Sequence, residues 1–318
     1  MEGYAVKIAI VGGSGHYRYV LNELKNHTLL GIAPGIIGED LTKLQTALAK
    51  RELEAPVFDD WKKLVKNADA VVVNTRPDKN AIVSAYCLER DIHVFSEKPL
   101  AIDMPQLQML GKVTEKSKAS ICAMFGIRYT GWYKAVKEAV RDIGTIRLIQ
   151  AQKSYKLGVR PDFYKTKSTF GGIIPWVSIH ALDWILDLTG AKVTAIGADT
   201  NNDHNFGNGD LEMTGLCQLQ LEGGILASVS ADFFRPQGAP THDDDRIRVV
   251  GTQGIVEYMG GVVTKLDASG QTQLPIGEGE DVFALFLRRI AGEDVGVSPQ
   301  ESFYLTELAL NLNEAAEP

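Results

Sequence analysis

The chain has 318 residues, of which 45% are hydrophobic and 23% are charged, and its formal net charge is −7. This length is long for a single hydrophobic core and therefore predicts two domains. The acidic balance, without any run of basic residues, argues against nucleic acid or an anionic membrane as a partner.

Several absences point to a cytoplasmic protein. No apolar run approaches the roughly 20 residues that span a bilayer, and the start, MEGYAVKIAIVGG, lacks the features of a signal peptide. The three cysteines, Cys87, Cys122 and Cys217, lie too far apart in the sequence to suggest a metal site or a disulfide framework. We expect them to be small buried hydrophobes, and we expect no resident metal and no membrane partner.

The first 125 residues alternate strand-like with helix-like segments. Continuous apolar runs predict strands at 7–12, 28–33, 56–58, 68–74, 93–96 and 119–125. Helices are expected at about 16–25, 40–50, 61–65, 81–90 and 103–117. Asp59 or Asp60 is expected to cap the helix at 61–65. This alternation is typical of βαβ units, so residues 1–123 are predicted to form a doubly wound, parallel α/β domain.

The pattern changes after residue 125. A helix at 132–140, a strand at 146–155 and an irregular stretch precede the apolar helix that carries His180. Strand-like runs without helices between them follow at 192–198, 214–222, 224–233, 246–251, 254–260 and 261–267. This order predicts a mostly antiparallel sheet. With two closing helices, at 281–292 and 301–316, residues 124–318 are expected to form an α+β domain.

The turn after the first strand, VGGSGHYRY, suits a dinucleotide. Glycines let the backbone approach a pyrophosphate, and the N–H groups that follow face its negative charge. The best register is Gly13-x-Gly15-x-x-Arg18, which lacks the third glycine of the usual fingerprint, so an ordinary turn is the alternative. The expected cofactor contacts here are Gly12, Gly13, Ser14, Gly15 and His16. The second strand ends in Ala33-Pro34-Gly35, without a ribose-binding acid or a phosphate-binding arginine, so NAD and NADP both stay open.

The segment FSEKPLA (95–101) follows another predicted parallel strand. Ligands of open α/β sheets bind at the carboxyl ends of the strands, where Lys98 would project its ammonium group. There it can polarise a hydroxyl or carbonyl of a substrate. Pro99 restricts Lys98 to an extended conformation and permits a cis peptide bond. The alternative is a solvated surface lysine.

With these motifs, the chain resembles the Gfo/Idh/MocA family of NAD(P)-dependent oxidoreductases over essentially its whole length. The resemblance is carried by IAIVGGSG, AVVVNTRPDKNA, HVFSEKPLA, MFGIRYT, FGGIIPWVSIHALDWI and RIRVVGTQGIVE. It implies a Rossmann domain followed by a domain with a large open sheet, through which members commonly form homodimers or homotetramers. It also implies NAD or NADP as cofactor and a small polyol or sugar as substrate.

The resemblance also assigns roles to residues. It implies that Lys98 contacts the nicotinamide ribose and the substrate hydroxyl, and that His180 takes the hydroxyl proton as the hydride leaves. Further cofactor contacts are expected at Asn74, Thr75, Arg76, Pro77 and Glu97. Three positions depart from the family: Trp176 stands where many members have aspartate, Asn80 where they often have histidine, and Arg76 where they often have proline. Trp176 can stack on a sugar face or fill the pocket, and Arg76 can contact a phosphate or a carboxylate.

A helical wheel of residues 174–188 places Trp176, His180, Asp183 and Asp187 on one narrow polar stripe. Because the remaining face is apolar, the helix is expected to be buried, with the stripe facing a cleft or solvent. Pro175 suits the first helical turn. Asp183 can accept a hydrogen bond from an imidazole nitrogen and raise its basicity. His180 is therefore predicted to be the general base, and the alternative is a structural histidine bonded to a buried carboxylate.

Other polar residues complete the predicted site. Tyr155, Arg160 and Tyr164 lie where the family's substrate loops fall, and we expect them to bind substrate together with Lys98, Trp176 and His180. The run His242-Asp243-Asp244-Asp245 is interpreted as a solvated turn rather than a metal site.

The sequence thus predicts a cytoplasmic NAD(P)-dependent oxidoreductase that acts on a secondary alcohol of a sugar, cyclitol or related polyol. Two alternatives stay open. One is a binding or regulatory protein built on a retired dehydrogenase, and the other is an enzyme that retains NAD and uses transient oxidation for elimination or glycoside cleavage.

Overall fold

The computed structural model describes residues 5–317, and within them the chain forms two compact units. The first unit contains residues up to Gly126 together with Asp281–Glu307. The second contains Ile127–Glu280 and the residues from Leu308 onward.

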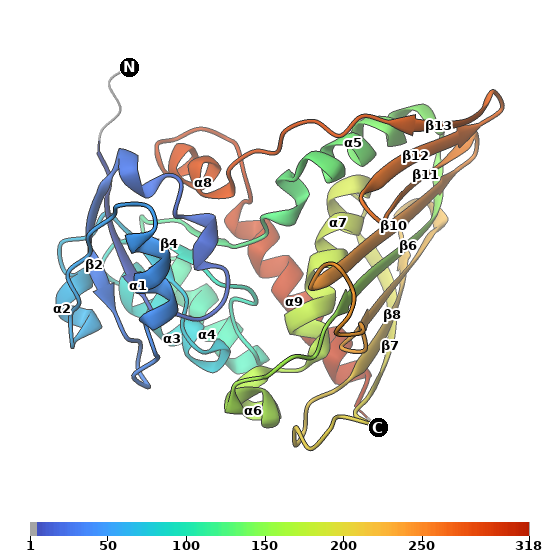
Figure 1. The fold of residues 1–318 in the computed structure, drawn as a ribbon. Helices are drawn as coiled ribbons and strands as arrows, with labels where there is room; N and C mark the ends of the chain where they lie inside the picture. Colours follow the sequence, from blue (N-terminus) through green and yellow to red (C-terminus); the bar gives the residue numbers. More distant parts are fainter. Residues whose placement is uncertain (1–4, 318) are drawn as a thin grey trace. The chain divides into compact units, whose positions relative to one another are not determined.

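The first unit is built on a parallel sheet. Among the described residues it has five strands, in the order β2-β1-β3-β4-β5 (Figure 1). They are β1 (Lys7–Val11), β2 (Thr28–Ala33), β3 (Ala70–Val73), β4 (His93–Ser96) and β5 (Ile121–Ala123). The strand order reverses between β1 and β3, which creates the crevice where such sheets bind ligands. The strand expected at 56–58 is wrong: Val57 makes only an isolated bridge to Ile32.

Helices connect these strands. They are α1 (Thr42–Ala49), α2 (Trp61–Val65), α3 (Pro77–Leu88) and α4 (Met104–Thr114). Asp60 caps α2 by accepting a hydrogen bond from the N–H of Lys62. The helix expected at 16–25 is wrong, because only the 3-10 turns η1 (Tyr17–Tyr19) and η2 (Leu24–Asn26) form there. Aromatic residues and asparagine in this stretch have low helix propensity, and most of its turns close with i→i+3 bonds.

The closing helix α8 (Val282–Ile290) and the first part of α9 (Pro299–Ala315), up to Glu307, belong to the first unit. The rings of Phe283 and Phe286 in α8 lie 5.3 and 5.1 Å from that of Phe95 in β4. The Ser302 hydroxyl accepts a hydrogen bond from the N–H of Ala123 at 3.0 Å. Residues 281–307 therefore pack with the first unit, whereas we expected them in the domain 124–318. The cause is the apolar face of α8, which is buried against β4.

The second unit is built on a large open sheet. Among the described residues it has eight strands, in the order β13-β12-β11-β10-β6-β9-β8-β7. They are β6 (Ile146–Tyr155), β7 (Val193–Asn201), β8 (Thr214–Leu221), β9 (Ile225–Asp232), β10 (Asp243–Gly251), β11 (Gly254–Met259), β12 (Val262–Asp267) and β13 (Gly270–Leu274). All neighbours pair antiparallel except β6 and β9, which confirms the mostly antiparallel prediction. Residues alternate between buried and exposed along β8.

One face of this sheet carries helices α5 (Gly131–Ala139) and α7 (Ile179–Thr189) (Figure 1). Within residues 5–317, no helix of the second unit covers the other face in that view. Shorter helical turns complete the unit: η3 (Ile127–Tyr129), η4 (Val140–Asp142), η5 (Asp162–Lys165), α6 (Lys167–Phe170), the π-helix η6 (Ile174–Ser178) and η7 (Glu222–Gly224).

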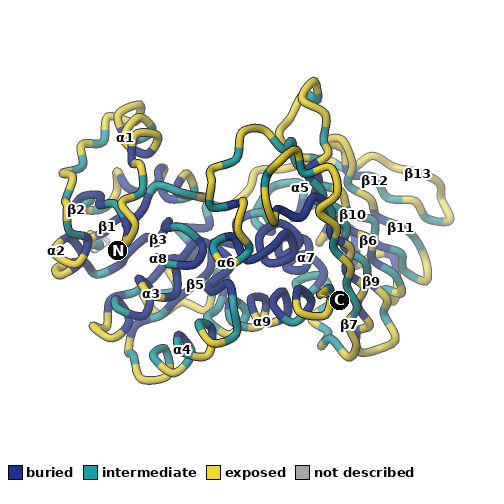
Figure 2. Tube along the Cα trace, turned by 90° about the horizontal axis from the view of Figure 1, so that it is seen from below, coloured by how far each residue is buried: buried dark blue, intermediate teal, exposed yellow. Residues whose placement is uncertain are grey.

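The segment Lys167–Thr189, which contains α6, the π-helix η6 and α7, is long and apolar enough to cross a membrane by length and composition. However, 89% of its most apolar window is buried inside the protein, as in the core helix of a globular domain. Figure 2 shows α7 mostly buried, in contrast to β13 at the sheet edge. The three cysteines are buried as expected, and burial raises the pKa of the Cys87 and Cys217 thiols to about 12.

Candidate active site

The loop after β1 brings its backbone unusually close to two neighbouring segments. Gly12 and Gly15 have φ angles of +86° and +68°, which side chains rarely adopt. A Cβ atom on Gly12 would lie 2.2 Å from the carbonyl oxygen of Asn74, and one on Gly15 would lie 2.1 Å from Oε2 of Glu97. Only glycine fits at these two positions. The predicted loop is therefore a preformed, narrow turn at the carboxyl end of β1.

The Glu97 carboxylate anchors this loop. It is 0% exposed, and its Oε2 accepts a hydrogen bond from the N–H of His16 at 2.6 Å, while Oε1 lies 2.8 Å from His16 Nδ1. Burial alone would raise the pKa of Glu97, but the charge and hydrogen bonds of His16, together with Lys98, bring it below its usual value. The carboxylate thus links the glycine loop to the end of β4.

Lys98 follows directly. Its N–H donates to Oε1 of Glu97 at 3.1 Å, and the residue is only 1% exposed. The Lys98–Pro99 peptide bond is cis. The burial of Lys98 excludes the alternative of a solvated surface lysine. Lys98 lies just after β4, at the carboxyl end of that strand.

Asn74 to Pro77 occupy the end of β3 and the start of α3. Asn74 is fully buried, yet neither atom of its side-chain amide has a hydrogen-bond partner among residues 5–317. Buried polar groups are normally paired, so this amide fits a ligand. The Thr75 hydroxyl donates to Asn80 at 2.8 Å, and Pro77 begins α3. The Arg76 guanidinium, expected to contact a phosphate or a carboxylate, donates to the Asp78 carboxylate at 2.7 Å.

Sequence reasoning missed Glu39. The loop after β2 folds back so that Oε1 of Glu39 accepts a hydrogen bond from the N–H of Arg76 at 3.0 Å. Its Oε2 is buried without a partner among the described residues, and it lies 2.6 Å from where a Cβ atom on Gly35 would be. A carboxylate therefore does stand at the end of the second strand. The only signal was an acid shortly after Pro34-Gly35, and its return depends on the path of the loop.

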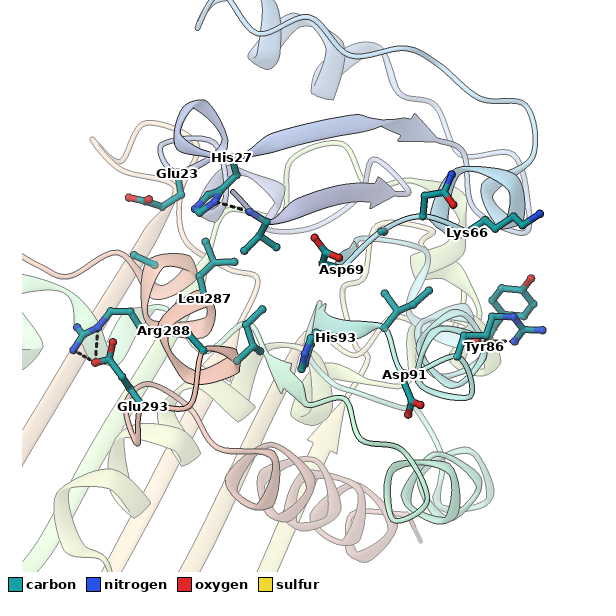
Figure 3. Close-up of a pocket in the computed structure, with 18 of the residues that line it drawn as sticks. Glu23, His27, Lys66, Asp69, Tyr86, Asp91, His93, Leu287, Arg288 and Glu293 are labelled. Carbon is teal, nitrogen blue, oxygen red and sulfur yellow. Dashed lines mark hydrogen bonds and ion pairs between the residues drawn. The ribbon is translucent and has the colours of Figure 1, made fainter. Parts of the chain in front are cut away.

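The glycine loop, Asn74, Glu39 and Lys98 all lie at the carboxyl edge of the parallel sheet, where a dinucleotide fits. A cavity of about 1160 Å³ lies at the opposite edge. Figure 3 shows that His27, Asp69 and His93, at or just before the starts of β2, β3 and β4, surround this cavity together with Leu287 of α8. Its position separates it from the cofactor-binding edge.

In the second unit, His180 and Asp183 are 1% and 2% exposed. Nε of Arg128, in η3, lies 3.5 Å from Oδ1 of Asp183, and its NH1 atom lies 3.3 Å from Oδ1 of Asp187. Asp187 also accepts hydrogen bonds from the Tyr133 hydroxyl at 2.6 Å and from Lys137 at 2.9 Å. These two carboxylates of the predicted polar stripe thus face η3 and α5, where we expected a cleft or solvent. Arg128 was missed, although it lies in the motif MFGIRYT.

Trp176 belongs to an aromatic cluster. It lies in the π-helix that precedes α7, with its ring centroid 5.9 Å from that of Tyr164 and 6.0 Å from that of Phe170. The Arg160 guanidinium lies 5.1 Å from the Tyr164 ring and 4.6 Å from the Phe233 ring. The structure therefore brings three predicted substrate residues together through ring and cation contacts.

Tyr155 joins this cluster through Phe233, at a centroid distance of 6.3 Å, and its ring stacks on His242. Burial raises the pKa of Tyr155 well above its usual value, and the nearby Asp245 and Asp243 carboxylates add to the effect. Its phenol is therefore a neutral hydrogen-bonding group at neutral pH.

The acidic run at 243–245 begins β10, so the expected solvated turn is wrong. Asp245 forms an ion pair with Lys153, which is fully buried, and Asp244 pairs with Arg235 at 3.1 Å and with Arg246 at 2.7 Å. These ion pairs with β6, Arg235 and Arg246 explain why the acids continue a strand. Within residues 5–317, no group of three or more His, Cys, Asp or Glu is placed to hold a metal ion.

Two family models match the chain. Residues 6–125 match the GFO/IDH/MocA oxidoreductase family with its NAD-binding Rossmann fold, and residues 133–257 match the GFO/IDH/MocA C-terminal domain.

Individual proteins show the same relationship. Myo-inositol 2-dehydrogenase of Thermotoga maritima is 27% identical over 191 residues, which cover 59% of this chain and 55% of that protein. Inositol 2-dehydrogenase of Salmonella typhimurium is 25% identical over 191 residues, covering 57% of this chain and 55% of that protein. The chain thus spans little more than half the length of the curated relatives it matches.

Solved structures match over nearly the whole chain. A structure from Thermotoga maritima, described as a candidate oxidoreductase, is 43% identical, covers 98% of both chains and has a TM-score of 0.95. Levoglucosan dehydrogenase in complex with NADH shares the fold, with 17% identity, coverage of 98% of this chain and 97% of that one, and a TM-score of 0.81. The chain therefore belongs to the Gfo/Idh/MocA family of oxidoreductases, and its first unit is an NAD-binding Rossmann domain of that family.

Proposed function

We propose that this protein is a cytoplasmic, NAD-dependent dehydrogenase that interconverts a secondary alcohol and a ketone on a polyol, cyclitol or sugar. The observation that carries the proposal is the buried Lys98, which follows β4 and is tied through Glu97 to the glycine loop of an NAD-binding domain. The inositol 2-dehydrogenases among its relatives support the substrate class.

The residues at the carboxyl edge of the sheet favour NAD over NADP. A carboxylate at the end of the second strand can accept hydrogen bonds from ribose hydroxyls and repels a 2′-phosphate. Glu39 supplies this carboxylate. Arg76, the nearby cation, is engaged by Asp78 and so is less available to a phosphate. The Asn74 amide and the backbone of the glycine loop supply the remaining polar contacts.

The glycine loop, Asn74 and Glu39 would hold NAD, which would supply the hydride acceptor for oxidation of the alcohol and the hydride donor for reduction of the ketone. The ammonium group of Lys98 donates a hydrogen bond to the substrate oxygen and stabilises the negative charge that develops there. Such stabilisation is strongest where water is excluded. Lys98 is only 1% exposed, so its ammonium group lies in such an environment.

His180 is the proposed general base. It takes the hydroxyl proton during oxidation and returns it during reduction. Asp183 lies on the same face of α7, one turn after His180, and Arg128 holds its carboxylate at 3.5 Å. We propose that Asp183 sets the orientation of the imidazole ring. Tyr155, Tyr164 and Trp176 provide phenol and ring surfaces of the kind that bind sugars.

The outer face of the second unit's sheet suits assembly into a homodimer or homotetramer. Leu216 and Met259 are 42% and 58% exposed there, and both line a hollow of about 710 Å³ on this face. Exposed apolar patches of this kind commonly mark protein interfaces.

Replacing Gly15 with alanine should weaken NADH binding at least about tenfold, because the new Cβ atom would collide with the Glu97 carboxylate that shapes the loop. A titration followed by nicotinamide fluorescence measures the dissociation constant. Gly260→Ala is the matched control, since Gly260 also has a positive φ but has open space around it. If the wild-type protein, freed of nucleotide, binds no NADH, the retired-dehydrogenase alternative holds instead.

Glu39→Gln should reduce the preference for NAD over NADP by about tenfold, or ~1.4 kcal/mol, because it removes the charge that repels the 2′-phosphate. The measurement compares NADH and NADPH affinities of the variant with those of the wild type. Glu54→Gln, at an exposed glutamate, is the control. An unchanged ratio would remove Glu39 from the cofactor site.

His180→Ala and Lys98→Ala should each lower turnover at least about a hundredfold while the fold stays intact, because each removes a group that handles charge at the reacting oxygen. Turnover is followed as NADH formation with a panel of polyols, and unfolding temperatures check the fold. His204→Ala and Lys50→Ala, at exposed residues, serve as controls. Near-normal turnover in both active-site variants would refute the assignment. NADH that copurifies and is never released would support the redox-neutral alternative.

Leu216→Glu combined with Met259→Glu should convert the oligomer to a monomer, because two carboxylates would be buried at the interface. Sedimentation equilibrium measures the mass of each form. Val57→Glu places a charge at a similarly exposed residue of the first unit and should leave the mass unchanged. A wild-type monomer would contradict the proposal.

A further inference from the structure

Two cations near α7 differ from the others in this region. Arg128, Lys153 and Lys167 each pair with a carboxylate, on Asp183, Asp245 and Glu212 respectively. In contrast, Lys156 donates through Nζ to the carbonyl oxygen of Ala239 at 2.5 Å, and Arg160 donates through NH2 to the carbonyl oxygen of Lys156 at 2.9 Å. Within residues 5–317, neither side chain forms an ion pair. Each of these two cations is therefore held by a backbone carbonyl oxygen rather than by a carboxylate.

Arg160 is held in a defined place. Its guanidinium lies 4.6 Å from the Phe233 ring and 5.1 Å from the Tyr164 ring, and its Nε is buried without a hydrogen-bond partner among the described residues. Guanidinium groups are favourably placed against aromatic rings, which leaves their N–H edge for a ligand. Arg160 is thus prepositioned rather than freely solvated.

Arg160 is connected through aromatic side chains to the helix that carries the proposed general base, His180. The Tyr164 ring that contacts Arg160 also meets the Trp176 ring edge-on at 5.9 Å. Trp176 lies about one helical turn before His180 in the same continuous helix. Arg160 is therefore two ring contacts away from the helix turn that carries His180.

The positive charge of Arg160 affects the pKa values of two neighbouring residues, His242 and Tyr155. Lys156 donates its backbone N–H to the carbonyl oxygen of His242 at 3.0 Å. The pKa of His242, an exposed residue, is lowered by partial loss of water and then by Arg160, which together with the lysines outweighs the opposite effect of Asp243. Arg160 likewise opposes the increase in the pKa of Tyr155. Arg160 therefore acts on both Tyr155 and His242, and Lys156 acts on His242.

This arrangement suits a bound anion. The planar guanidinium matches the two oxygens of a carboxylate or the oxygens of a phosphate, and the lysine adds a point charge. Two partly buried cations without a counter-ion are costly, and an anionic ligand removes that cost. A neutral polyol would leave both charges uncompensated.

We propose that Arg160 and Lys156 bind the anionic group of the substrate, so that the preferred substrates are polyols or sugars that carry a carboxylate or a phosphate. This inference rests on the proposed dehydrogenase function and names its substrate class. Tyr155 and Tyr164 add neutral hydroxyl groups for the sugar hydroxyls next to the anion.

Matched pairs of ligands test the proposal by calorimetry on the full-length protein, with and without NADH. The pairs are D-glucuronate with D-glucose, D-gluconate with D-glucitol, and glucose 6-phosphate with glucose. We expect at least one charged member to bind about tenfold or more tightly than its neutral counterpart. The carboxylate and phosphate pairs show which anion the site takes. In the double variant Arg160→Gln/Lys156→Gln, the charged and neutral members of that pair should bind alike.

Arg147→Gln is the control variant, because Arg147 is an exposed arginine that also donates only to carbonyl oxygens, those of Gly223 and Gly224. It should retain the preference, and unfolding temperatures confirm that all variants are folded. The proposal is overturned if no pair shows a preference for the anion, or if the double variant keeps that preference. Anion preference without hydride transfer to any ligand would instead defeat the dehydrogenase proposal and leave the anion site standing.

Discussion

The organisation of the first unit depends on the Glu97 carboxylate, which is buried at the end of β4. An ionised carboxylate without water is stable only when several donors replace the lost hydration. Here the donors are the backbone N–H groups of His16 and Lys98 and the His16 ring nitrogen. Because one carboxyl group contacts both segments, the glycine loop and Lys98 are positioned together. A loop held in this way can present its backbone to a ligand at little further conformational cost.

This anchor also accounts for the incomplete glycine fingerprint. The third glycine usually permits close packing between the first helix and the sheet. Arg18 occupies that position, and only the three-residue turn η1 forms there in place of a helix. The missing glycine and the missing helix are thus one feature. The close approach of the loop is fixed by Glu97 and Asn74 rather than by helix packing.

The second unit distributes its charges in an unusual way. The helix-covered side of the sheet holds buried ion pairs, including Lys153 with Asp245, while the outer face exposes apolar side chains such as Leu216 and Met259. Buried pairs are stable only when each charge is compensated, as Arg128 does for Asp183 and Asp187. The exceptions, Lys156 and Arg160, are therefore informative about the ligand. The apolar outer face is likewise informative about assembly.

Much of this protein follows from local sequence patterns. Continuous apolar runs identified the main parallel strands, alternation identified β8, and the position of Lys98 after an apolar run placed it at the edge where ligands bind. These features depend on residues that are close together in the sequence, so a local pattern of apolar and polar residues is enough to predict them. The family motifs added His180. The helical wheel predicted that its helix is buried, but it placed His180 on a stripe facing a cleft or solvent, whereas the residue is 1% exposed.

Other features were decided only by the tertiary structure. The Glu39 carboxylate returns to the end of β2 because its loop folds back, and no local pattern encodes that path. The aspartates at 243–245 continue β10 because Lys153, on the neighbouring strand, supplies a buried partner for Asp245. Arg128 pairs with Asp183 and Asp187, and α8 packs against Phe95 of β4, and in both cases the contacting residues are distant in the sequence. Local propensity determines which elements form, whereas the pairing of charges and apolar faces across the fold determines which residues meet.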